Sequence, residues 1–189
     1  MPDAPLSPQL QAVADEFRFA TARLHALRAA VPESRWGVRR DPDRWSVAEC
    51  VAHLNLTSAA YLGIIGDAIA RGRALPRPAR PRRYRRDPLG WLLWKMMPPP
   101  VRFRTRTAAA FVPGAVAPRD EQVAEFDRLQ DEQLRLLAQA DGLPLGAILV
   151  ASPFNARVRY NLFSCLSILP PHQHRHLWQA EQVWSDAVP

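Results

Sequence analysis

The chain contains 189 residues, of which 48% are hydrophobic and 23% are charged, which predicts one globular domain over residues 1–189 and argues against a disordered chain. Two cysteines are too few for a disulfide framework, so we expect buried thiols and a cytoplasmic location. No run approaches the roughly 18 apolar residues of a membrane span, and the first residues lack the basic and apolar regions of a signal peptide.

The net charge of +7 is concentrated in one segment. Residues 71–107 contain eleven arginines and one lysine against a single aspartate, a local charge of +11 that leaves −4 for the remaining residues. Because the overall charge reflects this segment alone, it does not by itself predict a nucleic-acid-binding protein.

Two amphipathic helices are predicted before the basic segment. The first begins after Ser7, with Pro8 at its first position, and ends before Pro32. The second begins at a capping box, formed by Ser46 and Glu49, and ends near residue 71. Their apolar residues recur at helical spacing and predict one buried stripe per helix: Leu10, Val13, Phe17, Leu24, Leu27 and Val31 in the first, and Val47, Val51, Leu54, Tyr61, Ile65 and Ala68 in the second.

Residues 72–117 interrupt the helical pattern, because prolines and arginines are too frequent there for a long unbroken helix. The central stretch GWLLWKMMPPP, residues 90–100, predicts one or two helical turns. Trp91 and Trp94 are expected to pack against the rest of the protein, since two exposed tryptophans are costly. The sequence therefore predicts a long, irregular, basic insertion.

Two further helices are predicted after the insertion, at residues 118–140 and 160–185, joined by a short irregular or extended connection. Pro170 and Pro171 fall inside the last helix, where we expect a kink or a fresh helical start. Four amphipathic helices without a convincing set of paired strands predict an all-α four-helix bundle, with the insertion between its second and third helices.

Three of the five histidines lie in the last predicted helix, after the two prolines. His172 and His176 are one turn apart, so their rings point to one side with Cβ atoms about 5–6 Å apart, which suits two ligands of one metal ion. His174 points to the opposite side, so a third ligand has to come from another helix, and His53 is the candidate. The alternative is a polar run that faces water. His25 has no such neighbour and is expected at the surface or at its boundary with the core.

Two segments, RWSVAECVAHL (residues 44–54) and PPHQHRHLWQAEQVW (residues 170–184), together resemble the DinB/YfiT-like superfamily of metalloenzymes. The resemblance covers residues 7–71 and 118–186. It implies a four-helix bundle in which His53, His172 and His176 are the metal ligands. The basic insertion departs from the short linker that is usual in this family.

The resemblance also implies a class of reaction. Three neutral imidazoles suit Zn²⁺, Ni²⁺ or a similar divalent ion, and they leave an open position that is typical of a catalytic site. Some members of the family are thiol transferases that use low-molecular-weight thiols. The leading hypothesis is therefore a metal-dependent thiol S-transferase that activates a small thiol toward a small-molecule electrophile. The alternative enzyme is a metal-dependent hydrolase that activates water instead.

Three residues near these histidines have ordinary interpretations beside functional ones. Glu49 precedes His53 by one turn and Gln179 follows His176, so each could orient a ligand ring or serve only as a helix cap or a solvated side chain. Cys50 could be a thiolate near the metal or a small core residue. The ordinary interpretation is favoured for all three.

The basic insertion supports a hypothesis of another class, a non-enzymatic module that binds an anionic partner. Arginines interleaved with aromatic residues suit nucleic acid or an anionic membrane surface, although both contacts are less favoured. They also suit a lid that binds substrate carboxylates, in which case Arg83, Arg86, Trp91 and Trp94 would bind substrate. Otherwise the segment packs on the helices or on a second subunit of a homodimer. The remaining arginines of this group are Arg80, Arg82, Arg85, Arg102, Arg104 and Arg106.

Overall fold

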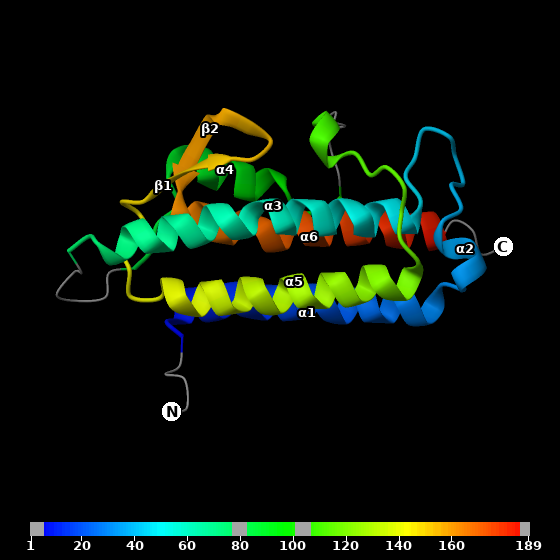
Figure 1. Cartoon of the computed structure of the whole chain (residues 1–189), viewed down its shortest axis with the longest axis horizontal. Helices are drawn as coiled ribbons and strands as arrows, with labels where there is room; N and C mark the ends of the chain where they lie inside the picture. The colour runs from blue at the N-terminus through cyan, green and yellow to red at the C-terminus, as the bar shows by residue number, and fades with distance from the viewer. Residues whose placement is uncertain (1–5, 77–82, 101–106, 186–189) are drawn as a thin grey trace.

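The computed structural model describes residues 6–76, 83–100 and 107–185. The long helices of these residues are α1 (Pro8–Ala30), α3 (Val47–Arg73), α5 (Arg119–Ala140) and α6 (Leu162–Ser185). Figure 1 shows them lying side by side, with α1 in contact with α5 and α6, and α3 in contact with the same two helices. The prediction of a mostly helical chain is confirmed.

The ends of these helices follow local sequence signals. Pro8 stands at the first position of α1, as predicted. At the start of α3 both bonds of the capping box are present: the Glu49 backbone N–H donates to Ser46 Oγ at 3.2 Å, and the Ser46 N–H donates to Glu49 Oε2 at 2.9 Å. A short helix that was not predicted, α2 (Glu33–Trp36), buries Trp36, whose indole N–H donates to Gln122 Oε1 at 2.8 Å.

Among the described residues of segment 72–117, the structure has one helix, α4 (Pro88–Met96), and one 3₁₀ turn, η1 (Ala109–Phe111). Asp87 caps α4 by accepting from the Gly90 N–H at 2.9 Å. The same carboxylate accepts from the Asn161 N–H at 2.6 Å and from the Ser164 hydroxyl at 2.8 Å, which fixes α4 to the start of α6. Only glycine fits at position 90, because a Cβ there would lie 2.1 Å from Ser164 Oγ. The predicted helical turns are therefore confirmed and anchored.

The connection between α5 and α6 is a β-hairpin, which was not predicted. Strands β1 (Leu149–Ser152) and β2 (Asn155–Asn161) pair antiparallel, with Val150 opposite Tyr160. The expectation of no paired strands is therefore wrong for this segment, although the extended alternative for the connection is correct. Two short strands around Pro153 carry too little alternation to be recognised in the sequence.

Helix α6 is continuous through Pro170 and Pro171, so the fresh helical start, one of the two alternatives expected there, does not occur. Every residue from Leu162 to Pro170 is buried against neighbouring elements. Tertiary packing of this kind holds a helix together across a proline that removes one of its backbone hydrogen bonds.

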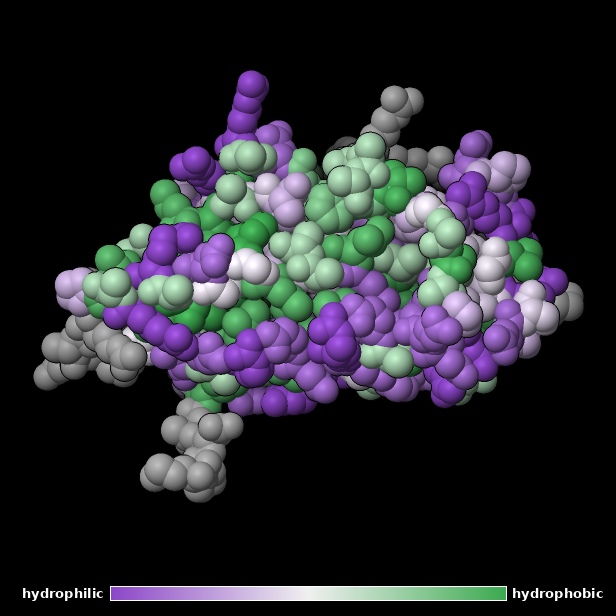
Figure 2. Space-filling view, in the orientation of Figure 1, coloured by the Kyte–Doolittle hydropathy of each residue, from purple (hydrophilic) through white to green (hydrophobic). Residues whose placement is uncertain are grey.

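The core between the long helices is apolar but contains a polar layer. Gln130 of α5 and Gln173 of α6 are 2% exposed, and each amide donates to the other side chain's oxygen, at 3.1 and 2.8 Å. Figure 2 shows a polar outer surface along α5 and a more apolar surface above it, over α3 and the segments that cross it. No helix within the described ranges is both long enough and apolar enough to cross a membrane.

Candidate metal centre

The structure brings together the three histidines expected to form a site. His53 of α3 and His172 and His176 of α6 each offer a ring nitrogen, and these atoms all lie within 4.8 Å of one another. The Nε2 atoms of His53 and His172 are 3.4 Å apart. The ring centroid of His176 lies 4.4 Å from the ring centroid of His53 and 4.6 Å from the ring centroid of His172. All three side chains are buried, so the cluster lies inside the protein and not on its surface.

Helical geometry explains which histidines join the cluster. His172 and His176 are one turn apart and share the side of α6 that faces α3. His174 lies on the opposite side, where its Nε2 is 2.9 Å from Glu16 and its Nδ1 is 3.0 Å from Arg23, both on α1. His25 is exposed beside Asp127, as predicted.

Burial keeps the three rings neutral at ordinary pH. Burial lowers the pKa of His172 to about 3, and the nearby His53 and Arg175 add to the effect. Burial, with the nearby His172, His53 and Arg175, lowers the pKa of His176 well below its ordinary value. Burial also lowers the pKa of His53, an effect that its hydrogen bond to Phe111 partly offsets. Neutral imidazoles carry the lone pairs that a metal ion needs, without competition from protons.

A backbone carbonyl fixes the orientation of one ring. His53 Nδ1 lies 2.8 Å from the Phe111 carbonyl oxygen in η1. Because a carbonyl only accepts, Nδ1 carries the proton, and Nε2 of the neutral ring keeps its lone pair toward His172 and His176. This contact is the arrangement expected behind a metal-ligating histidine. No sequence pattern could have indicated this contact, since any residue supplies a carbonyl.

Aromatic side chains surround the cluster. The Trp45 ring centroid lies 5.0 Å from that of His53, and the Phe154 centroid lies 6.1 Å from that of His172. Trp45 precedes the capping box of α3, and Phe154 lies in the turn of the β-hairpin. These rings limit access of water and lower the local dielectric constant.

The donor set fits a divalent metal ion. Three neutral imidazoles are suitable ligands for Zn²⁺, Ni²⁺ and similar first-row ions. In addition, the buried Nδ1 of His176 has no hydrogen-bond partner among the described residues, and a buried nitrogen of this kind calls for an explanation such as a ligand or an ion.

The supporting residues have mainly structural contacts. Glu49 accepts hydrogen bonds from Ser46 and forms an ion pair with Arg39, whose hydrogen bond is the main cause that lowers the pKa of Glu49. A hydrogen bond with the Gln179 side chain raises the pKa of His176 and so offsets a part of the lowering caused by burial. Burial raises the pKa of Cys50 to about 12, which agrees with a core thiol and not with a thiolate.

Arg86 and Trp94, two of the residues proposed to bind substrate, lie beside the first part of α6, away from the histidines. The Arg86 guanidinium stacks 4.0 Å from the Trp94 ring and 5.3 Å from the ring of Phe163. Phe163 precedes His172 by nine residues, or about 13 Å along the helix axis. Arg83 is exposed.

The expectation that both tryptophans pack is wrong for Trp91, which is 48% exposed. It lies on the outer side of α4, while Trp94, three residues later, faces inward and is half-buried. Five arginines of the same group, Arg80, Arg82, Arg102, Arg104 and Arg106, lie outside the described residues.

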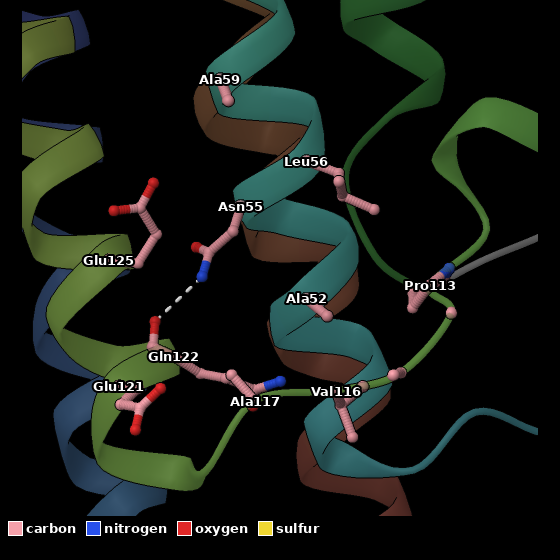
Figure 3. A pocket seen from close by; sticks show the side chains of 12 residues that line it. Ala52, Asn55, Leu56, Ala59, Pro113, Val116, Ala117, Glu121, Gln122 and Glu125 are labelled. Carbon is pink, nitrogen blue, oxygen red and sulfur yellow. Dashed lines mark hydrogen bonds between the residues drawn. The ribbon is translucent and has the colours of Figure 1, made fainter.

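A pocket of about 330 Å³ lies next to the cluster but does not include it. Figure 3 shows it between α3, α5 and residues 113–117, with Leu56 on one side and Glu121 and Glu125 on another. The Asn55 amide donates to the Gln122 carbonyl at 2.9 Å across its base. The wall at residues 113–117 continues directly from the turn that holds His53.

Comparisons with known proteins give one match. The sequence profile described as the DinB superfamily matches residues 16–180. No curated protein and no solved structure matches. The matched range contains all three histidines of the cluster.

Proposed function

Because the chain belongs to the DinB superfamily, we propose that it is a divalent-metal-dependent thiol S-transferase, with His53, His172 and His176 as the metal ligands. In this proposal the four long helices form a DinB-like four-helix bundle, and the basic insertion is an addition to it. The substrate is a small electrophile, and the co-substrate is a low-molecular-weight thiol.

One observation carries the proposal: three buried, neutral imidazoles from two helices converge within 4.8 Å. A structural role gives a poor account of this cluster, because burying polar rings without full hydrogen bonding costs free energy. The free energy lost at the unpartnered His176 Nδ1 is regained when that buried ring has a cation beside it.

The chain's own residues prepare the site for such an ion. Phe111 holds the His53 ring in one tautomer, and Trp45 and Phe154 shield the cluster from bulk water. A divalent ion bound by three imidazoles supplies a Lewis acid with an open position, which lowers the pKa of a thiol or of water. Zn²⁺ and Ni²⁺ are the ions we propose on the basis of the ligand types.

The test is a panel of cellular thiols combined with model electrophiles, assayed with metal-loaded protein. We expect thiol conjugation by the wild-type chain and by His25→Ala, an exposed histidine that serves as the control, and none by His176→Ala. Equal rates in wild type and His176→Ala would contradict the proposal. Turnover in the absence of any thiol would identify the metal-dependent hydrolase instead.

A further inference from the structure

The outward face of α4 is formed by large apolar side chains that remain in contact with solvent. Leu89, Trp91, Leu92 and Met96 are 38%, 48%, 47% and 52% exposed. At 100° per residue these positions and Lys95 fall on one side of the helix, so they form a continuous apolar stripe with a single charge. This set of residues is called the α4 face below.

The opposite side of α4 is fixed to the protein, so the α4 face cannot turn inward. Gly90 packs directly on Ser164, Leu93 packs against the core, and the Arg86 guanidinium contacts the rings of both Trp94 and Phe163 of α6. Asp87 ties the first turn to Asn161 and Ser164. The apolar stripe is thus held outward by specific contacts, which differs from scattered apolar residues on an ordinary surface.

Positive charge accompanies the stripe. Lys95 Nζ lies 5.1 Å from the Trp91 ring centroid, within the face itself. Arg83 and Arg85, shortly before the helix, are exposed. Residues 71–107 as a whole carry a charge of +11. An apolar helix face combined with lysine and arginine is the composition of segments that lie on anionic lipid surfaces.

Charge and hydrophobicity together distinguish between possible partners. A second copy of the chain would bring two strongly positive segments together, which is unfavourable. Nucleic acid would neutralise the arginines but would leave Leu92 and Met96 in water. An anionic lipid surface accommodates both the apolar side chains and the positive charges, because the apolar side chains enter the interface while the cations contact the headgroups.

We propose that α4 docks this protein onto anionic lipid surfaces, with Trp91, Leu92 and Met96 entering the interface and the neighbouring basic residues contacting the headgroups. The docking is peripheral, and it does not depend on the proposed metal-dependent activity.

The experiment is co-sedimentation of the full-length protein with vesicles of phosphatidylcholine alone or mixed with phosphatidylglycerol. We expect binding to the mixed vesicles only, weakened by salt, and reduced on the order of tenfold by Leu92→Glu. The matched control is Val38→Glu, which adds the same charge at a position that is also 47% exposed. Val38 follows α2, at the far end of the molecule from α4 (Figure 1), and we expect that variant to bind like wild type.

A second measurement locates the contact. Lipids with brominated acyl chains quench tryptophan fluorescence at short range, and we expect less quenching in Trp91→Phe than in wild type. Equal binding to neutral and mixed vesicles, or equal binding by Leu92→Glu and Val38→Glu, would overturn the proposal in favour of nonspecific attraction. Sedimentation velocity tests whether the α4 face instead binds a second copy of the chain. A wild-type dimer that dissociates in Leu92→Glu would show this and would overturn the proposal.

Discussion

The histidine cluster and the α4 face depart from ordinary polarity in opposite directions. The cluster places three polar rings inside the protein, where burial keeps them neutral. The α4 face leaves four large apolar side chains in water, on a helix that is anchored on its other side. Residues that contradict the rule of apolar inside and polar outside cost stability, so they point to a partner that restores the balance. The two regions therefore suggest two different partners, a cation and a lipid surface.

The strongest way to sharpen this comparison is to remove one ligand from the cluster. We expect His172→Ala to lower the affinity for Zn²⁺ by more than about 100-fold, since even residues behind the ligands contribute 10- to 100-fold. A competition titration with a chromophoric chelator measures it. His25→Ala is the control, and we expect Leu92→Glu, in the α4 face, to bind zinc as wild type does. A zinc affinity equal to that of wild type in His172→Ala would show that His172 is not a metal ligand.

The anchoring of α4 predicts the next largest effect. Asp87→Ala removes a helix cap worth about 1 kcal/mol and leaves the buried partners of the carboxylate unsatisfied, at a cost of about 1 kcal/mol or more. We therefore expect the free energy of unfolding to fall by about 2 kcal/mol in urea denaturation at neutral pH. An unchanged midpoint would mean that α4 is not held in the way described.

The same residue predicts a pH dependence. Burial raises the pKa of Asp87, but hydrogen bonds from Asn161, Gly90 and Ser164 outweigh it, so the net pKa lies below the ordinary value of 3.8. A lowered pKa means that the carboxylate stabilises the folded state fully above pH 3.8, and that this stabilisation is lost as the pH falls through the folded-state pKa. The difference in unfolding free energy between wild type and Asp87→Asn should thus shrink on acidification. A difference that grows on acidification would contradict the assignment.

A smaller effect separates the capping role of Glu49 from a role at the metal. Glu49→Ala breaks the capping box and should cost about 1 kcal/mol of stability. Because the carboxylate contacts Ser46 and Arg39, and His53 Nδ1 is held by Phe111, zinc affinity should stay within about threefold of wild type. Glu49→Gln keeps a capping side chain and serves as the control. A large loss of zinc affinity without loss of stability would show that Glu49 acts at the metal site and not only as a helix cap.

The smallest effect is expected on the α4 face. Leu92→Glu should change the free energy of unfolding by less than about 0.5 kcal/mol, because Leu92 lies on the outward side of α4 and is 47% exposed. Thermal unfolding in the absence of lipid checks this. A loss of more than about 1 kcal/mol would show that the face is packed in solution.

The sequence predicted the long helices and the cluster because both depend on helical period. The apolar stripes located α1, α3, α5 and α6, and the capping box located the start of α3 within one residue. The one-turn spacing of His172 and His176 placed two rings together. His53 was the candidate because bundle metal sites are built from facing helices, and the family resemblance, with which the profile match agrees, pointed to the same residue.

The remaining features depend on contacts that carry no period. The hairpin is two short strands around a proline, and Phe111 acts through its backbone, so neither has a sequence signature. The outward orientation of Trp91 follows from the packing of Gly90 on Ser164. These two residues are 74 positions apart in the chain, so no local pattern could reveal their contact. Composition alone favoured the burial of Trp91, and a tertiary contact decided otherwise.

The most direct test of the central claim is elemental analysis of the purified protein beside its His53→Ala and His25→Ala variants. If His53, His172 and His176 bind one cation together, the wild type and His25→Ala retain about one divalent ion per chain after dialysis, and His53→Ala retains essentially none. A full complement of metal in His53→Ala would contradict the three-histidine site.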